Sequence, residues 1–172
     1  MKALIHDLKQ FAQQDFPVPE ITSYLSHYKL SEGTLDDYVK FKEEKYTRHL
    51  VHKDEDFEIL IVCWQAGQKA PIHGHEGEKC WMRVESGKLQ VCNYQLDSPQ
   101  PLALTMTELV NGEKGFLDGP ADIHSVENCF EEAAISLHLY AKPFTQCDVY
   151  NLDEGTINSV QLAYDSKYKN PC

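Results

Sequence analysis

The spacing of hydrophobic residues changes near residue 45 of this 172-residue chain. Before that point, apolar residues recur at helical spacing over residues 4–11 and again over residues 21–25, with Pro17 and Pro19 between the two runs. Thr34 can cap a third helix, because acidic residues follow in its first turn. Residues 1–45 are therefore expected to form a small helical segment.

From Tyr46 onward, short runs of β-branched and aromatic residues alternate with Gly, Pro, Asn and Asp turns, which predicts strands. The expected strands cover residues 47–52, 58–64, 80–86, 88–95, 103–109, 115–117, 124–128, 134–141 and 156–162. The turn at residues 85–88 predicts a hairpin between two of them. Many short antiparallel strands are typical of a jelly-roll barrel. We expect one mainly β domain, with the helices packed on a barrel of residues 46–164 and a loosely held tail at 165–172.

Composition narrows the possible partners. The net charge of -11, from 27 acidic and 16 basic residues, would repel a phosphate backbone, so nucleic acid is not expected. No apolar stretch reaches the roughly 18 residues of a membrane span, and the N-terminus does not resemble a secretory signal. The six cysteines are irregularly spaced and form no CxxC pair, which favours reduced thiols. A cytoplasmic monomer is expected.

Three histidines form the candidate metal site. His73 and His75 are one residue apart on an extended segment, so both point to the same side, and antiparallel pairing can bring His124 beside them. Neutral imidazoles bind iron, copper, nickel or zinc, and three of them leave coordination positions open. A lone histidine is more often structural, and that interpretation is kept for the remaining candidates, which are His6, His27, His49 and His52.

These spacings resemble the two motifs of the cupin superfamily, and the resemblance implies a cupin-type jelly-roll barrel. The matching positions are Gly67, His73, His75 and Gly87 in the first motif and His124 and Asn128 in the second. Cys80 occupies the place of the usual ligand glutamate. Glu76 and Glu78 lie nearby but not at the motif position, so a site of three histidines without a carboxylate is expected.

The run 134–141 alternates strictly between apolar and polar residues. Ser136, His138 and Tyr140 share one face of this expected strand. Such a row is either the polar outer face of an ordinary strand or a hydrogen-bonded relay inside the barrel.

Together these residues resemble the cysteine dioxygenase family over nearly the whole chain. The segments that carry the resemblance are Tyr46-Thr-Arg48, Ile61-Val-Cys63-Trp64, Ile72-His73-Gly-His75 with Cys80, His124-Ser-Val-Glu-Asn128, and Ser136-Leu-His138-Leu-Tyr140 with Pro143-Phe144 and Cys147. The resemblance implies a non-haem Fe(II) enzyme that oxidises L-cysteine with O2 to cysteine sulfinic acid.

The resemblance also implies a role for each residue. His73, His75 and His124 would bind the iron, and Arg48, supported by Tyr46, would bind the substrate carboxylate. Tyr140 would contact substrate and oxygen, oriented by His138 and Ser136. Cys80 and Tyr140 stand where the family's animal members carry a thioether crosslink, and Cys147 matches a cysteine near the pocket. One departure is that Ala141-Lys142 replaces the Ser-Pro of those members.

Three alternatives remain open at this point. A related dioxygenase of 3-mercaptopropionate usually carries glutamine at the position of Arg48, so Arg48 favours an amino-acid thiol. A non-catalytic metal-binding cupin would bind a ligand without consuming oxygen. A zinc or manganese isomerase is disfavoured by the missing glutamate and by the row of Ser136, His138 and Tyr140.

Overall fold

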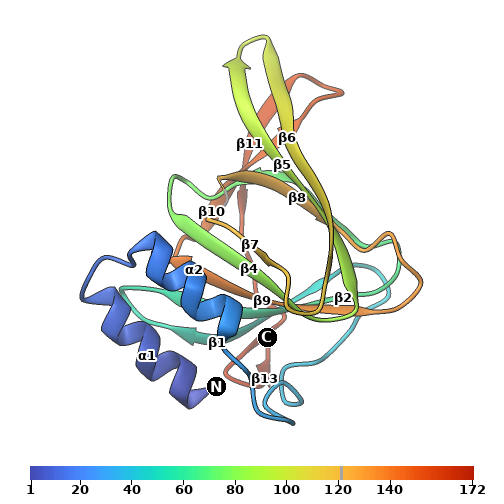
Figure 1. Ribbon diagram of the computed structural model, residues 1–172. Helices are drawn as coiled ribbons and strands as arrows, with labels where there is room; N and C mark the ends of the chain where they lie inside the picture. The colour runs from blue at the N-terminus through green and yellow to red at the C-terminus, as the bar shows by residue number, and fades with distance from the viewer. Residues whose placement is uncertain (121) are drawn as a thin grey trace.

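The computed structural model describes residues 1–120 and 122–172, and its architecture is two β-sheets with two helices at the N-terminus (Figure 1). The helices are α1 (Lys2–Ala12) and α2 (Val18–His27). The strands are β1 (Thr47–Lys53), β2 (Glu58–Trp64), β3 (Lys69–Gly74), β4 (Lys79–Ser86), β5 (Lys88–Pro99), β6 (Leu102–Glu113), β7 (Leu117–Asp118), β8 (Ile123–Glu127), β9 (Ala134–Ala141), β10 (Gln146–Asn151), β11 (Thr156–Gln161), β12 (Ser166–Lys167) and β13 (Asn170–Pro171).

The two sheets face each other across an apolar interior. One sheet has the strand order β13-β12-β1-β2-β9-β4-β7 and the other β11-β10-β3-β8-β5-β6. Leu60 and Val62 from the first sheet pack in one buried cluster with Val91 and Val126 from the second. The predicted mainly β jelly-roll fold with a small helical segment is confirmed.

The helices cover the outer face of the seven-stranded sheet. Leu4 and Leu8 of α1 lie in one buried cluster with Leu137 and Leu139 of β9. Successive strand residues point to opposite faces, so the polar residues of β9 that alternate with these leucines point into the barrel. This placement favours the relay interpretation of that row over an exposed polar face.

The third helix predicted from Thr34 is absent, and residues 34–38 form turns instead. The carbonyl oxygen of Lys40 accepts hydrogen bonds from the Thr47 hydroxyl, at 2.6 Å, and from the ring of His49, at 2.9 Å. Because this carbonyl oxygen already accepts two hydrogen bonds from residues of β1, it is not available for the backbone hydrogen bond of a helix that continues past residue 40. Tertiary contacts therefore override the local capping signal.

The predicted hairpin at residues 85–88 is also wrong, because β4 and β5 belong to different sheets. Gly87 instead carries the chain from one sheet to the other, at φ 71°. A Cβ atom there would lie 2.5 Å from the carbonyl oxygen of Ala133. Strand β5 instead forms a hairpin with β6, and this hairpin projects beyond the barrel (Figure 1).

The C-terminal tail, residues 165–172, which was expected to be loosely held, is paired with the barrel at its start. Strand β12 pairs in parallel with β1, and the fully buried Ser166 is 2.7 Å from the ring of His49. The Asp165 carboxylate forms ion pairs with Lys42 and Lys45. A polar tail can thus be ordered when its polar groups find partners on the barrel.

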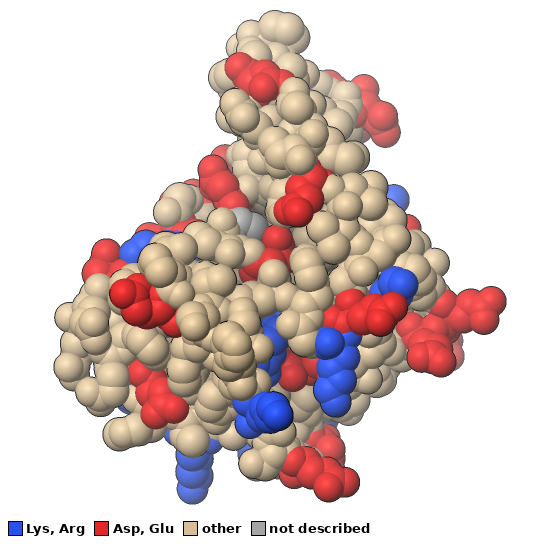
Figure 2. Space-filling model, in the orientation of Figure 1, with Lys and Arg blue, Asp and Glu red and all other residues tan. Residues whose placement is uncertain are grey.

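Acidic side chains are spread over the visible face of the molecule, from the projecting hairpin to the base (Figure 2), in keeping with the net charge of -11. Within the described ranges, neither helix has the length and apolar character needed to cross a membrane.

Candidate metal centre

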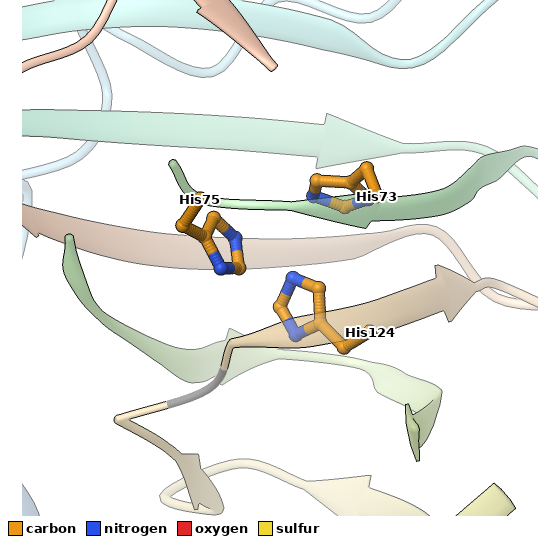
Figure 3. Close-up of side chains that lie close together, drawn as sticks. All are labelled: His73, His75 and His124. Atoms are coloured by element: carbon orange, nitrogen blue, oxygen red, sulfur yellow. The ribbon is translucent and has the colours of Figure 1, made fainter. Parts of the chain in front are cut away.

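Three imidazole rings meet inside the barrel (Figure 3). His73 lies on β3 directly opposite His124 on β8, and His75 follows the end of β3. The candidate ligand atoms of the three histidines all lie within 4.8 Å of one another. The structure therefore brings together the three histidines that the sequence pattern singled out.

Hydrogen bonds orient the rings of His73 and His124. The Nδ1 atom of His73 is 2.8 Å from the carbonyl oxygen of Pro71, and Nδ1 of His124 is 3.0 Å from the carboxylate of Asp118. Because these acceptors require a proton on Nδ1, each ring is left with a lone pair on Nε2 for a metal ion. Asn93 in turn donates to Asp118 at 2.9 Å.

The electrostatics of the site favour a neutral ring at His73. Burial and the neighbouring His124 lower the pKa of His73 to about 3. Burial is the largest single influence on Asp118 and acts against its charge, but the hydrogen bonds from His124 and Asn93 and the nearby imidazoles together outweigh it and lower the pKa of that carboxyl. Neutral imidazole is the form that binds a metal, so the residues present fit a divalent transition-metal ion.

The ligand group contains no carboxylate among the described residues. The Glu78 carboxylate accepts a hydrogen bond from the backbone of Lys142 at 3.0 Å, and Glu76 is exposed. The peptide bond between Ala141 and Lys142, where the sequence departs from the family pattern, is cis.

His73 and His124 line a cavity of about 100 Å³, and Arg48, Tyr46, His138, Tyr140 and Cys147 also line it. Its volume is far below the roughly 300–1,000 Å³ of pockets for drug-sized ligands, so it suits a small molecule.

Arg48 brings a positive charge to this cavity. Within residues 1–120 and 122–172, its guanidinium donates only to the carbonyl oxygen of Ala163, at 3.2 Å, and pairs with no carboxylate. Most of its five N–H donors are therefore available to an anionic ligand. Tyr46 stacks on Trp64, with ring centroids 4.6 Å apart.

The polar row of β9 is hydrogen-bonded along its length. The Ser136 hydroxyl is 2.9 Å from Nε2 of His138, and Nδ1 of that ring is 3.3 Å from the Tyr140 hydroxyl. The indole N–H of Trp64 donates to Ser136 at 2.9 Å. Burial and the nearby His124 hold the pKa of His138 well below its usual range, so this ring is neutral. Burial likewise raises the pKa of Tyr140, which keeps its proton.

Cys80 on β4 and Tyr140 on β9 are directly opposite each other in the antiparallel ladder. Side chains in such a pair have Cβ atoms about 4.5–5.5 Å apart and share a face of the sheet. Both are buried. Cys147 lines the same cavity from β10 on the opposite sheet.

Asp118 and Trp64 contribute to the site but were not predicted from the sequence. Asp118 precedes a Gly-Pro turn and gives no local sign of its contact with His124, six residues later. Trp64 belongs to a segment that carries the family resemblance, but no role was assigned to it. Its position two residues after Val62, on the inward face of β2, is the signal that could have placed its indole near Ser136.

Comparison with known proteins agrees with this geometry. The model of the family "Cysteine dioxygenase type I" matches residues 1–153. Cysteine dioxygenase type 1 from Rattus norvegicus and from Homo sapiens are each 28% identical to this chain over 170 residues, which cover 96% of the chain and 84% of each relative.

Solved structures support the fold alone. A protein from Thermus thermophilus superposes with a TM-score of 0.53 at 20% identity, covering 66% of this chain and all of the other. A Klebsiella pneumoniae protein with a double-stranded β-helix domain gives a TM-score of 0.52 at 16% identity, covering 78% and 97%. The family match extends over most of the chain and includes all three clustered histidines, so this chain belongs to the cysteine dioxygenase type I family.

Proposed function

We propose that this enzyme oxidises L-cysteine with O2 to cysteine sulfinic acid at one Fe(II) ion held by His73, His75 and His124. The observation that carries the proposal is an arginine that has no carboxylate partner among the described residues and shares a cavity of about 100 Å³ with His73 and His124, two of the three clustered histidines. In the overall reaction both atoms of O2 add to the thiol sulfur, so that RSH becomes RSO2H. When bound, Fe(II) would supply the open coordination positions and the redox chemistry for this step.

Arg48 would fix the substrate through its carboxylate. The planar guanidinium can donate two parallel hydrogen bonds to a carboxylate, which sets the distance and the orientation of the amino acid together. A substrate held in this way would keep its thiol and amine on the histidine side of the cavity. We assign Tyr46 to the support of this wall, since it lines the cavity and packs on Trp64.

The polar row of β9 would control one proton. Because Trp64 donates to Ser136, the hydroxyl proton of Ser136 is available to Nε2 of His138. A neutral His138 then carries its own proton on Nδ1 and donates it to the Tyr140 oxygen. The hydroxyl proton of Tyr140 is thereby left to point into the cavity, toward substrate and oxygen.

We also propose the thioether between Cys80 and Tyr140. Its formation breaks the cysteine S–H bond and one ring C–H bond and makes one C–S bond, while two protons and two electrons pass to O2. Turnover should lower the intact mass by about two hydrogen masses and join the two tryptic peptides in a form that reducing agents do not separate, unlike a disulfide. Two separate peptides after turnover would contradict this assignment.

Oxygen uptake by iron-loaded protein with L-cysteine, together with identification of the product by mass spectrometry, tests the proposal. Arg48→Gln should lower kcat/KM for L-cysteine by about 30-fold or more, because losing a charged hydrogen-bond partner costs about 2 kcal/mol or more. The bound iron should stay unchanged.

Other outcomes would select the alternatives. A higher kcat/KM on 3-mercaptopropionate would overturn L-cysteine as the substrate. Ligand binding without thiol-dependent oxygen uptake would indicate a non-catalytic cupin. Full zinc occupancy with no activity after iron loading would reject the dioxygenase itself.

A further inference from the structure

The C-terminal segment 163–166 lies against Arg48 at several points. The backbone N–H of Arg48 donates to the Asp165 carboxylate at 3.0 Å, and the N–H of Asp165 donates to the carbonyl oxygen of Arg48 at 2.7 Å. The guanidinium donates to the carbonyl oxygen of Ala163 at 3.2 Å. Both ends of the arginine are thus held by one short segment, which begins after the part of the chain matched by the family model, residues 1–153.

Tyr164 adds an aromatic face beside the guanidinium. The Cζ atom of Arg48 is 5.7 Å from the centroid of the Tyr164 ring, within the range of a cation–π contact. Such a contact restricts the guanidinium plane without using any of its N–H donors. Those donors remain available on the side of the cavity.

The far end of the Tyr164 ring is fixed as well. Its hydroxyl donates to the carboxylate of Glu58 at 2.7 Å and accepts from the ammonium of Lys53 at 3.0 Å. Glu58 is fully buried and forms an ion pair with Lys53 at 2.9 Å. A buried ion pair is costly to rearrange, so the ring has one well-defined position.

Tyr164 does not line the cavity itself, so any effect it has on the substrate must pass through Arg48. We propose that Tyr164 is a positioning residue that holds the Arg48 guanidinium for the carboxylate of the substrate. The C-terminal segment 163–166 then determines how strongly the enzyme prefers a thiol with a carboxylate over one without. This inference rests on the proposed role of Arg48 in L-cysteine oxidation.

Anaerobic calorimetry with metal-loaded protein tests it, using L-cysteine and its carboxylate-free analogue cysteamine as probes. Tyr164→Leu removes the ring and should weaken L-cysteine binding by about tenfold while changing cysteamine binding less than about twofold. Tyr164→Phe keeps the ring but loses its anchors, so its effect should be smaller and in the same direction. Tyr168→Phe, at a tyrosine 53% exposed in the same tail, is the control and should leave both affinities unchanged.

A double-mutant cycle tests whether Tyr164 affects L-cysteine binding through Arg48. Once Arg48→Gln is present, Tyr164→Leu should cause no further loss of L-cysteine binding. Equal weakening of both probes, or an undiminished Tyr164→Leu effect on the Arg48→Gln background, would overturn the inference. So would Tyr164 variants that bind both probes like the wild type.

The two proposals fail in different ways. If wild-type protein consumes oxygen with L-cysteine and Tyr164→Phe and Tyr164→Leu keep its preference over cysteamine, the positioning role alone is wrong. If wild-type protein prefers L-cysteine in calorimetry but consumes no oxygen, the dioxygenase activity is wrong and the binding cycle still decides the role of Tyr164.

Discussion

Ser136 connects the indole of Trp64 to the ring of His138 and, through it, to Tyr140. A serine hydroxyl has one proton and two lone pairs, so the bond it accepts from Trp64 biases where its own proton goes. The side chain of one small residue therefore sets the tautomer of a buried histidine.

Replacing Ser136 tests this role. Ser136→Ala should lower kcat for L-cysteine by about tenfold or more, because the Tyr140 proton loses its fixed direction, while KM and bound iron change little. Trp64→Phe should act in the same direction and less strongly. The comparison variant is Ser159→Ala, at an exposed serine of β11. An unchanged kcat in Ser136→Ala would show that the row of β9 is structural only.

His49 gives a prediction about pH. Burial lowers the pKa of this histidine in the folded protein below the ordinary 6.5. Above pH 6.5 both the folded and the unfolded chain carry it neutral. As the pH falls below 6.5, the unfolded chain binds a proton that the folded chain does not, so the free energy of unfolding decreases, by up to about 1.4 kcal/mol per pH unit.

His49→Gln should therefore reduce the slope of unfolding free energy against pH between about pH 5 and 6.5 in metal-free protein. Denaturant titration at several pH values measures that slope. His6→Gln, which removes an exposed histidine, should leave it unchanged. Identical slopes for wild type and His49→Gln would contradict the assignment.

At the scale of elements, the turn at Gly87 carries the chain from one sheet to the other. Gly87→Ala should lower the free energy of unfolding by about 2 kcal/mol or more, since it combines a positive φ with overpacking against Ala133. Thermal melting should shift by roughly 4–8 °C. Gly155→Ala is the matched control, because φ there is 65° and a Cβ would meet nothing within 4 Å, so it should cost less. Equal shifts would exclude the steric part of the argument.

The sequence predicted the bounds of the strands better than it predicted which strands pair with one another. The predicted strands 58–64 and 134–141 have the bounds of β2 and β9, because the apolar run of the first and the strict alternation of the second are strong local signals. The hairpin at Gly87 failed for a different reason: a turn signal gives a reversal of the chain but does not say which strand lies alongside. The third helix failed because Lys40 serves β1 through contacts that no local pattern contains.

The same distinction holds within the site. His73 and His75 share a short motif, so their proximity could be predicted from spacing alone. Asp118, Trp64 and the C-terminal segment 163–166 reach the site through tertiary packing, which no local sequence pattern records. A polar tail in particular has the composition of a disordered end until its partners are known.

At the scale of the whole molecule, metal binding should be coupled to stability. The histidines come from both sides of the β3–β8 pair, so an ion would bridge two segments about 50 residues apart in the chain. At a free metal concentration 100 times Kd, binding adds about 2.7 kcal/mol, which corresponds to a rise of roughly 5–10 °C in Tm. Anaerobic melting with Fe(II) and with excess chelator measures the difference. His73→Ala should abolish it, and a persistent shift in that variant would place the ion elsewhere.

The expected monomer remains a prediction, and light scattering on the metal-loaded protein would test it. The long β5–β6 hairpin projects from the body and presents Met106 and Leu109, each about half exposed, to solvent. If light scattering showed a dimer, this exposed apolar surface would be the first candidate for the interface.

The residues assigned to metal binding and those assigned to substrate binding come from different sheets. The candidate metal ligands stand on or beside strands of the six-stranded sheet, whereas Arg48 and the row of β9 belong to the seven-stranded sheet. Directed evolution could exploit this separation, because randomising inward positions of β1 and β9 would alter substrate choice without touching the residues that carry the metal. New thiol oxidations can therefore be sought by changing the side chains that the seven-stranded sheet contributes to the cavity while the metal ligands of the six-stranded sheet stay the same.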